Sequence, residues 1–296
     1  MSLLNTLRFL VRHPLNADRK LYALKRFAAW QLGSRLSPGS VAVDFVDDAR
    51  LLVARGMKGA TGNVYTGLHE FDDMGFLLHV LRPDDGFVDI GANVGTYTVL
   101  AGKAVGAQCI SIEPIPATFA SLLDNIRLND LSGRVRALNL GLGRTSDRLR
   151  FTARLDTTNH VVGDGEAVGE VVEVPVEPLD RVLDGVVPQL IKIDVEGFEA
   201  EVIAGAHATL SNEALLAVIM ETNGAGQRYG NADEGLHEAM LGFGFESFRY
   251  APLDRTLTSL DSGFNTIGNT LYIRDAALVR ERTRTAPRFD VQGVSL

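Results

Sequence analysis

The stretch Phe-Val-Asp-Ile-Gly-Ala-Asn-Val-Gly, residues 87–95, decides the fold. Its apolar start is typical of a short buried strand, and residues 96–105 follow with apolar side chains at helical spacing. The glycines between them let the backbone turn sharply and approach a ligand where a Cβ would clash. Asn93 stands where the dinucleotide fingerprint needs its second glycine, and no Gly-Lys-Ser/Thr phosphate loop follows. The stretch therefore predicts a strand–helix turn suited to a nucleoside without phosphates.

Strands and helices alternate outward from this turn. Such alternation implies right-handed crossovers and a parallel sheet with helices on both faces. The last two strands have no helix between them, which favours an antiparallel hairpin that closes the sheet. The other predicted strands are 109–112, 135–138, 171–176, 190–193, 215–220, 245–248 and 269–273, the predicted helices are 116–129 and 198–210, and a loop is predicted at 156–169.

Glu113 ends the second predicted strand, 22 residues after Gly91. From that position a carboxylate accepts hydrogen bonds from both hydroxyls of a ribose. Asp89 lies just before the turn, so two carboxylates frame it. Together they make a nucleoside-binding site a more specific prediction than the two glycines alone.

The overall composition excludes several classes of protein. Hydrophobic residues make up 46% and charged residues 22%, which is typical of a globular chain with a sizeable core rather than a disordered one. The formal charge of −8 disfavours nucleic acid as a partner. A single cysteine, Cys109, permits no internal disulfide, and we find neither a signal peptide nor a membrane-spanning run. We expect a cytoplasmic protein.

The first 36 residues differ from the rest in charge. They hold seven Lys or Arg and one acid, a charge of +6. Since the net charge of the whole chain is −8, the remaining residues carry −14. Leu21, Leu24, Phe27, Ala28 and Gln31 fall at helical spacing. We favour a helical cap whose stripe packs on the main domain or on a twin subunit in a homo-oligomer. The alternative is an interfacial helix on an anionic membrane surface.

These patterns divide the chain into three parts. Residues 1–65 form an N-terminal extension with a basic helical cap and a strand pair, and residues 66–279 form the main α/β domain. The polar residues 280–296 are expected to fray as a tail.

Three separated motifs carry a family resemblance. They are the segments 87–98 (FVDIGANVGTYT), 112–119 (IEPIPATF) and 191–199 (IKIDVEGFE). In this order they closely resemble the FkbM family of S-adenosylmethionine-dependent methyltransferases, over about residues 68–275. The resemblance implies a class I, Rossmann-like methyltransferase fold, with a seven-stranded, mostly parallel sheet in the order 3-2-1-4-5-7-6. It also implies S-adenosylmethionine as cofactor and O-methylation of a sugar, glycan or secondary metabolite.

The resemblance also implies roles for particular residues. Residues of the glycine turn should surround the methionine part of the cofactor, Glu113 the ribose, and residues after the second and third strands the adenine. A residue ahead of the first strand should close over the cofactor. The implied cofactor-binding residues are Glu70, Asp89, Gly91, Asn93, Gly95, Glu113, Pro114, Ile115, Asn139, Gly141 and Asp194.

Catalysis on a hydroxyl calls for a general base. Asp194 ends the fourth strand and points into the crevice, where it either acts as base or binds the cofactor's ammonium group. Glu221, at the end of the fifth strand, and His160, in a loop, are the other candidates. We predict no metal, although Asp194, Glu221 and Asn223 offer the oxygen ligands that Mg²⁺ prefers.

Two other classes of function remain open at this point. A non-catalytic S-adenosylmethionine sensor would keep the binding motifs, whereas a nicotinamide oxidoreductase is disfavoured by Asn93. The expected partner is a small-molecule or glycan acceptor.

Overall fold

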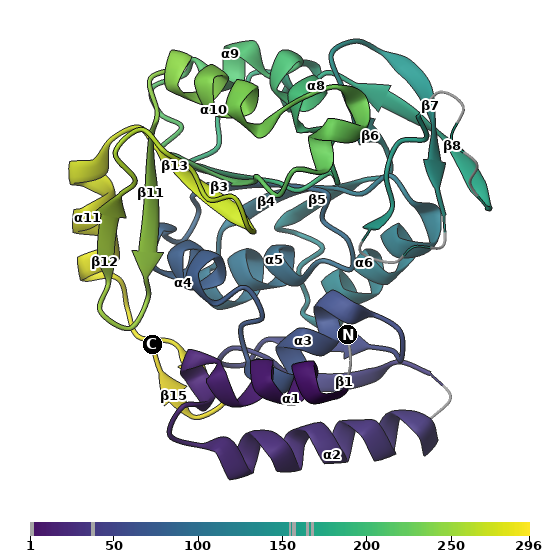
Figure 1. Cartoon of the computed structure of the whole chain (residues 1–296), viewed down its shortest axis with the longest axis vertical. Coiled ribbons are helices and arrows are strands. Elements are labelled where there is room, and N and C mark those ends of the chain that lie inside the picture. The colour runs from purple at the N-terminus through teal and green to yellow at the C-terminus, as the bar shows by residue number, and fades with distance from the viewer. Residues whose placement is uncertain (1–2, 37–38, 154, 156–157, 164–165, 167–168) are drawn as a thin grey trace.

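The computed structural model describes residues 3–36, 39–153, 155, 158–163, 166 and 169–296. Its centre is an eight-stranded sheet in the order β12-β11-β13-β10-β9-β3-β4-β5 (Figure 1). Without β12 this is the order 3-2-1-4-5-7-6, and β13 runs antiparallel to both neighbours. The predicted class I methyltransferase fold is therefore confirmed. The strands are β3 (Gly86–Ile90), β4 (Gln108–Ile112), β5 (Val135–Leu138), β9 (Leu190–Ile193), β10 (Ala217–Glu221), β11 (Glu246–Ala251), β12 (Thr256–Ser259) and β13 (Asn269–Ile273).

Helices cover both faces of the sheet (Figure 1). Because successive strand residues point to opposite faces, β3 contributes Phe87 to one core and Val88 to the other. Both cores are apolar and closed, so the ligand-accessible groups lie at the strand ends. The helices are α4 (Phe71–Val80), α5 (Thr96–Val99) with a π-helical continuation η2 (Leu100–Val105), and α6 (Pro116–Leu128) on one face, and α7 (Leu179–Leu183), α8 (Glu199–Ala204), α9 (His207–Leu210) and α10 (Asp233–Gly242) on the other.

The sheet departs from the prediction in two places. It has eight strands rather than seven, because β12 pairs with β11 in an antiparallel hairpin. This strand has four residues of which only Leu257 is buried, too short a pattern to recognise. The predicted helix 198–210 is two helices. It breaks at Gly205, where a Cβ would lie 2.1 Å from the carbonyl oxygen of Gly143 in the neighbouring segment.

A smaller three-stranded sheet lies beside β5, and a 3₁₀ turn follows β10. The small sheet joins β6 (Gly141–Leu142), β7 (Asp147–Thr152) and the predicted strand β8 (Val171–Glu177), and the turn is η4 (Ala225–Tyr229). Part of the predicted loop 156–169 lies outside the described residues.

The N-terminal extension packs beneath α4, α5 and α6 (Figure 1). Two buried asparagines hold it in place, one within α6 and one at its C-cap. Asn129 exchanges hydrogen bonds with the backbone of Arg50 (both 2.8 Å), and Asn125 accepts one from Leu52 N–H (2.7 Å) while donating to Val94 of the glycine turn (2.8 Å). The extension is thereby tied to the turn. Its elements are α1 (Leu3–Arg12), η1 (Pro14–Asn16), α2 (Lys20–Leu36), β1 (Val41–Asp44), β2 (Arg50–Val53) and α3 (Lys58–Thr66).

The predicted apolar stripe of α2 faces the protein only in part. Phe27 packs on the core beside the buried Ala23 and Trp30, and Gln31 donates to the Tyr65 hydroxyl (2.7 Å). Leu21, Leu24 and Ala28 are exposed, so the prediction of the packing face was wrong for these three residues, because the helix carries apolar residues on two sides. Among the described residues, no helix is long and apolar enough to cross a membrane.

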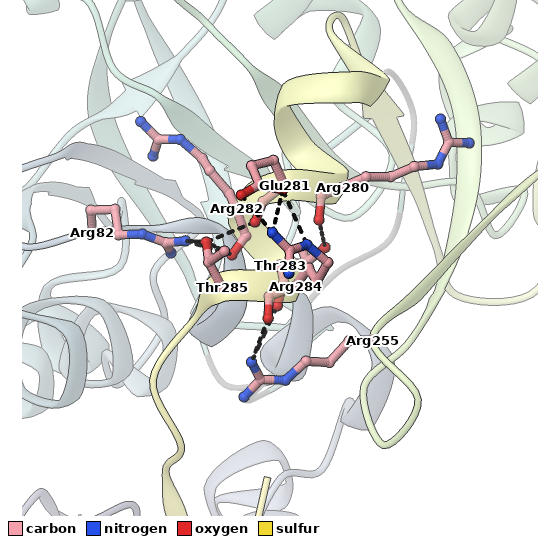
Figure 2. Close-up of polar contacts among 8 residues, drawn as sticks. All are labelled: Arg82, Arg255, Arg280, Glu281, Arg282, Thr283, Arg284 and Thr285. Carbon is pink, nitrogen blue, oxygen red and sulfur yellow. Dashed lines mark hydrogen bonds and ion pairs between the residues drawn. The ribbon is translucent and has the colours of Figure 1, made fainter.

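The C-terminal segment is folded, so the expectation of a fraying tail was wrong. It forms α11 (Ala276–Thr285) and the hairpin β14 (Asp290–Val291) and β15 (Val294–Ser295), which buries Val291 and the terminal Leu296. Figure 2 shows arginines converging on the end of α11. Arg255 donates to the carbonyl groups of Thr283 (3.4 Å) and Arg284 (3.3 Å), so it satisfies acceptors that a helix end leaves open.

Candidate active site

The carboxyl ends of β3, β4, β9 and β10 meet at one edge of the sheet, where a cavity of about 370 Å³ opens. This is the edge at which open α/β sheets bind ligands. Gly91, Glu113, Asp194 and Glu221 follow or end these four strands, and all of them line the cavity. The structure thus brings together residues that are up to 130 positions apart in the chain.

The glycine turn lies against the end of β9. Gly91 has φ 76°, and a Cβ there would lie 1.8 Å from the backbone oxygen of Asp194, so only glycine fits. Asn93 also adopts a positive φ of 50° and lines the cavity. Gly95 has a different role: it precedes α5 and packs on Leu122, which a Cβ would approach to 2.5 Å.

Glu113 joins the turn to the end of β4. Its side chain accepts hydrogen bonds from Asn93 N–H (3.0 Å) and Ile115 N–H (2.9 Å), one on each oxygen. Burial raises the pKa of Glu113 to about 7, although the two N–H donors act in the opposite direction. A carboxylate has about four acceptor positions, so both oxygens keep capacity for ligand hydroxyls.

A buried ammonium group stands among the carboxylates. Lys192 is 3% exposed, and its Nζ lies 2.6 Å from Asp194 Oδ2 and 4.8 Å from the centre of the Tyr97 ring. Burial alone lowers the pKa of Lys192, but the charges of Asp194, Glu70 and Asp89 outweigh it and raise that pKa. Lys192 therefore stays charged and fixes the orientation of Asp194.

Asp89, near the carboxyl end of β3, has a hydrogen-bond partner on only one of its two oxygens. It is 1% exposed, and its Oδ2 accepts a hydrogen bond from the Thr98 hydroxyl (2.7 Å). Among the described residues, its Oδ1 has no hydrogen-bond partner. Burial raises the pKa of Asp89. A buried oxygen of this kind, on the wall of a cavity, is suited to a ligand donor.

Three carboxylates crowd together beside Lys192. Asp194, Glu196 and Glu221 each offer an oxygen atom within 4.8 Å of the others. Burial and then the charge of Asp194 raise the pKa of Glu196 to about 7 and that of Glu221 to about 9. Such crowding favours a positively charged ligand, whether a metal ion or an organic cation.

The loop after β9 is held in the shape that turns Glu196 toward this cluster. Glu196 has φ 54°, an uncommon conformation for a residue with a side chain, and Gly197 follows with φ 103°. The buried Glu199 accepts hydrogen bonds from two backbone N–H groups of the loop (3.1 and 3.2 Å). Glu199 therefore braces the loop and has no direct part in the cavity.

Most of the predicted cofactor-binding residues line the cavity. They are Glu70, Asp89, Gly91, Asn93, Glu113, Pro114, Ile115, Gly141 and Asp194. Asn139 lies behind them, where its side chain donates to the carbonyl oxygens of Glu113 (2.8 Å) and Pro114 (2.9 Å). It supports the turn that carries Glu113.

The structure does not bring His160 into this cavity. The side chain is buried in the small sheet, with Nε2 2.9 Å from Glu166 and Nδ1 2.9 Å from the Thr158 carbonyl oxygen. Because both ring nitrogens already have partners, we no longer consider His160 as the base.

Sequence reasoning missed several lining residues. Lys58 and Asn63 come from α3 of the extension, and His69 from the segment that follows it. No local pattern could have indicated them, since they reach the cavity only through packing. Lys192 had a signal, because a lysine inside the four-residue apolar strand Leu190–Ile193 has to be paired with an acid.

Comparison with known proteins supplies the family. The model of the methyltransferase FkbM domain matches residues 89–250. The chain belongs to the FkbM methyltransferase family. The matched range includes the glycine turn, Glu113, Lys192, Asp194 and Glu221.

Relatives of this FkbM domain are identical to it at about a third of the aligned positions. Methyltransferase 1 of Beauveria bassiana is 34% identical over 149 residues, covering 42% of this chain and 59% of that protein. The hexuronic acid methyltransferase AglP of Haloferax volcanii is 31% identical over 140 residues, covering 46% of this chain and 56% of that protein. The chain therefore spans less than three fifths of these curated relatives. Among solved structures, the precorrin-6y C5,15-methyltransferase of Geobacter metallireducens is 11% identical with a TM-score of 0.41, covering 70% of this chain and 88% of that one.

Proposed function

We propose that this protein is an S-adenosylmethionine-dependent methyltransferase that acts on a hydroxyl group of a sugar, a glycan or a secondary metabolite. The observation that carries the proposal is a cavity in which a glycine turn without a pyrophosphate cradle meets Glu113, Asp89 and Asp194. That combination suits a positively charged nucleoside without phosphates. Membership of the FkbM family supports the reaction, and AglP supports a sugar as acceptor.

The residues present fit this cofactor. The ribose hydroxyls would donate to Glu113, and Pro114 and Ile115 would flank the adenine. The unpartnered Oδ1 of Asp89 and the carboxylate of Asp194 would accept from the ammonium group of the methionine part. When bound, the cofactor supplies a methyl group activated by a sulfonium charge.

We assign the role of general base to Glu221 rather than to Asp194. Lys192 already bonds to Asp194 Oδ2 at 2.6 Å, so that oxygen is occupied by a charged donor. One oxygen of Glu221 has no hydrogen-bond partner among the described residues, and the pKa of about 9 makes Glu221 the stronger base once it is ionised. A cation bound beside it favours that ionised form. Glu221 then accepts the proton from the acceptor hydroxyl, while Asp194 and the glycine turn hold the cofactor in line.

A second cavity, of about 490 Å³, suggests where the acceptor lies. It shares His69 and Glu70 with the first cavity. Asn269, on its wall, is the direct cross-strand partner of Glu221 in the β10–β13 pair. A hydroxyl group of a molecule bound there would face Glu221 across a short distance along the same sheet edge.

The charge of the second cavity favours a neutral acceptor. Glu70, Asp72 and Asp73 line it, against one guanidinium, that of Arg249. Burial raises the pKa of Asp73 to about 7, so it still carries charge for part of the time at neutral pH. A carboxylate on the acceptor would be repelled, and we therefore propose neutral sugars or hydroxylated metabolites rather than uronic acids as substrates.

Two experiments in sequence test the proposed function. Calorimetry with S-adenosylmethionine and with NAD⁺ should show binding of the first only; binding of NAD⁺ alone would overturn the proposal. Transfer of a labelled methyl group should then be measured on a panel of neutral hexoses, deoxyhexoses, hexuronic acids and hydroxylated polyketides, with and without Mg²⁺. Label in the neutral acceptors, lost in Glu221→Gln, is the expected result. Cofactor binding without transfer to any acceptor would instead indicate a sensor.

A further inference from the structure

One face of α2 exposes large apolar side chains to solvent. Leu21 is 76% exposed, Leu24 36%, Leu32 66% and Leu36 85%. They lie on the side of the helix opposite Ala23 and Trp30, which pack inward. We call this set of four leucines the outer face of α2. Since large exposed apolar patches on soluble domains mark interaction sites, this face needs a partner.

The charged residues within α2 are of one sign. Neither α1 nor α2 contains an acidic residue, and Lys20, Lys25 and Arg35 lie exposed along α2. Two neighbouring arginines turn inward instead: Arg19, just before α2, donates to the Gln292 carbonyl oxygen (2.8 Å), and Arg26 bonds to Asn16 (3.0 Å). The exposed cations of α2 itself are thus those that accompany the leucines, in a chain whose net charge is −8.

The position of α2 leaves its outer face open to a large flat partner. Figure 1 shows α2 as the outermost element at one end of the molecule, with α1 and α3 between it and the sheet. A planar surface can therefore reach the whole length of the helix. Long basic side chains at such a position bury their aliphatic stems with the leucines and keep the charge at the polar boundary.

We propose that the outer face of α2 binds the surface of an anionic lipid bilayer, with the helix lying in the plane of the headgroups. Leucines supply the apolar area that enters the acyl boundary, and Lys20, Lys25 and Arg35 contact lipid phosphates. A second copy of the chain fits less well. In a twofold dimer the same patch meets itself, so these three cations would face their counterparts with no acid on the helix to balance them.

Sedimentation of the full chain with vesicles tests this proposal. Vesicles of phosphatidylcholine and phosphatidylserine (7:3) should bind the protein about tenfold or more tightly than pure phosphatidylcholine, and raising NaCl from 0.05 to 0.5 M should remove most of that difference. Leu21→Ser with Leu32→Ser should lower the partition coefficient about tenfold or more. The matched control is Val186→Ser with Leu253→Ser, two exposed residues (51% and 57%) outside the extension, which should bind as the parent does.

Each other outcome would overturn the proposal. These are equal binding to both vesicles, equal loss in the control pair, or no effect of the α2 pair. A concentration-dependent dimer in light scattering that Leu21→Ser with Leu32→Ser abolishes, without vesicle binding by the parent, would assign the face to a second copy instead. Because these positions are exposed, the variants should keep the parent's circular dichroism and Tm.

Discussion

Replacing Lys192 by methionine should destabilise the protein strongly and in a pH-dependent way. Methionine keeps the length and most of the volume of the side chain, so the change isolates the charge. Lys192 is 3% exposed, and its loss leaves Asp194 and the buried Asp89 without their cation. Removing one partner of a buried ion pair costs about 3–5 kcal/mol. We expect the lower end, about 3 kcal/mol, because the Asp194 side chain is 27% exposed and keeps some hydration.

Thermal unfolding gives the measurement. For a chain of this size about 3 kcal/mol corresponds to a fall in Tm of roughly 6–12 °C. The fall should be larger at pH 8 than at pH 5.5, since burial raises the pKa of Asp89 and a protonated Asp89 no longer needs a cation beside it. The double variant Lys192→Met with Asp194→Asn should lose less free energy of unfolding than the two single variants lose together, by about 1.5 kcal/mol or more. Additive losses, or a Tm within 2 °C of the parent's at pH 8, would show that the pair does not organise the site.

Four further outcomes follow from the site and its supports. Glu113→Ala should weaken binding of S-adenosylmethionine by about 1.5–3 kcal/mol in calorimetry, the range for a charged hydrogen bond; unchanged affinity would refute its assignment to the ribose. Glu221→Gln should lower kcat about 100-fold or more with little change in cofactor affinity, and a loss of affinity alone would return the role of base to Asp194. Arg255→Ala should lower Tm by several degrees because the carbonyl groups at the end of α11 lose a hydrogen-bond donor. Arg284→Ala should not lower Tm, because Arg284 lies on α11 itself, is exposed and pairs with the exposed Glu281. The cofactor-free protein should have a higher Tm at pH 5.5 than at pH 8.5. Burial raises the pKa of Glu113 to about 7 and that of Glu221 to about 9, from ordinary values near 4.5. Between the ordinary and the raised values the folded state binds more protons than the unfolded state, so the stability falls as the pH rises.

Local sequence was sufficient for seven of the eight strands of the sheet and for the strand-end carboxylates. A strand followed by a glycine turn predicts a strand–turn–helix unit. Because such units form a parallel sheet, the carboxyl ends of β3, β4, β9 and β10 come to one edge. Asp194 and Glu221 follow from that geometry without knowledge of any contact. The family comparison agrees with the fold.

What sequence could not supply depended on packing between distant segments. An apolar stripe on α2 indicates a helix but not which side of it packs. Here Ala23 and Trp30 are buried, and the leucines are exposed. The tail is polar on average, yet Val291 and Leu296 are buried against the extension and α4 region, which no composition argument detects. The contribution of Lys58 to the cavity has the same origin.

Charge balance at the cavity connects stability to turnover. Without a ligand, burial and then the charge of Asp194 raise the pKa of Glu196 to about 7 and that of Glu221 to about 9, so at neutral pH Glu221 holds a proton and Glu196 does so for part of the time. In the proposed reaction, a bound cationic cofactor would favour release of those protons, so Glu221 would be free to act as a base. Methyl transfer would remove the sulfonium charge and release one proton from the acceptor hydroxyl. Glu221 would then be a stronger base than before, since the cation that kept it ionised would have gone, and it would retain the proton. The same crowding that weakens the empty fold would thus drive the proton transfer forward and loosen the neutral product.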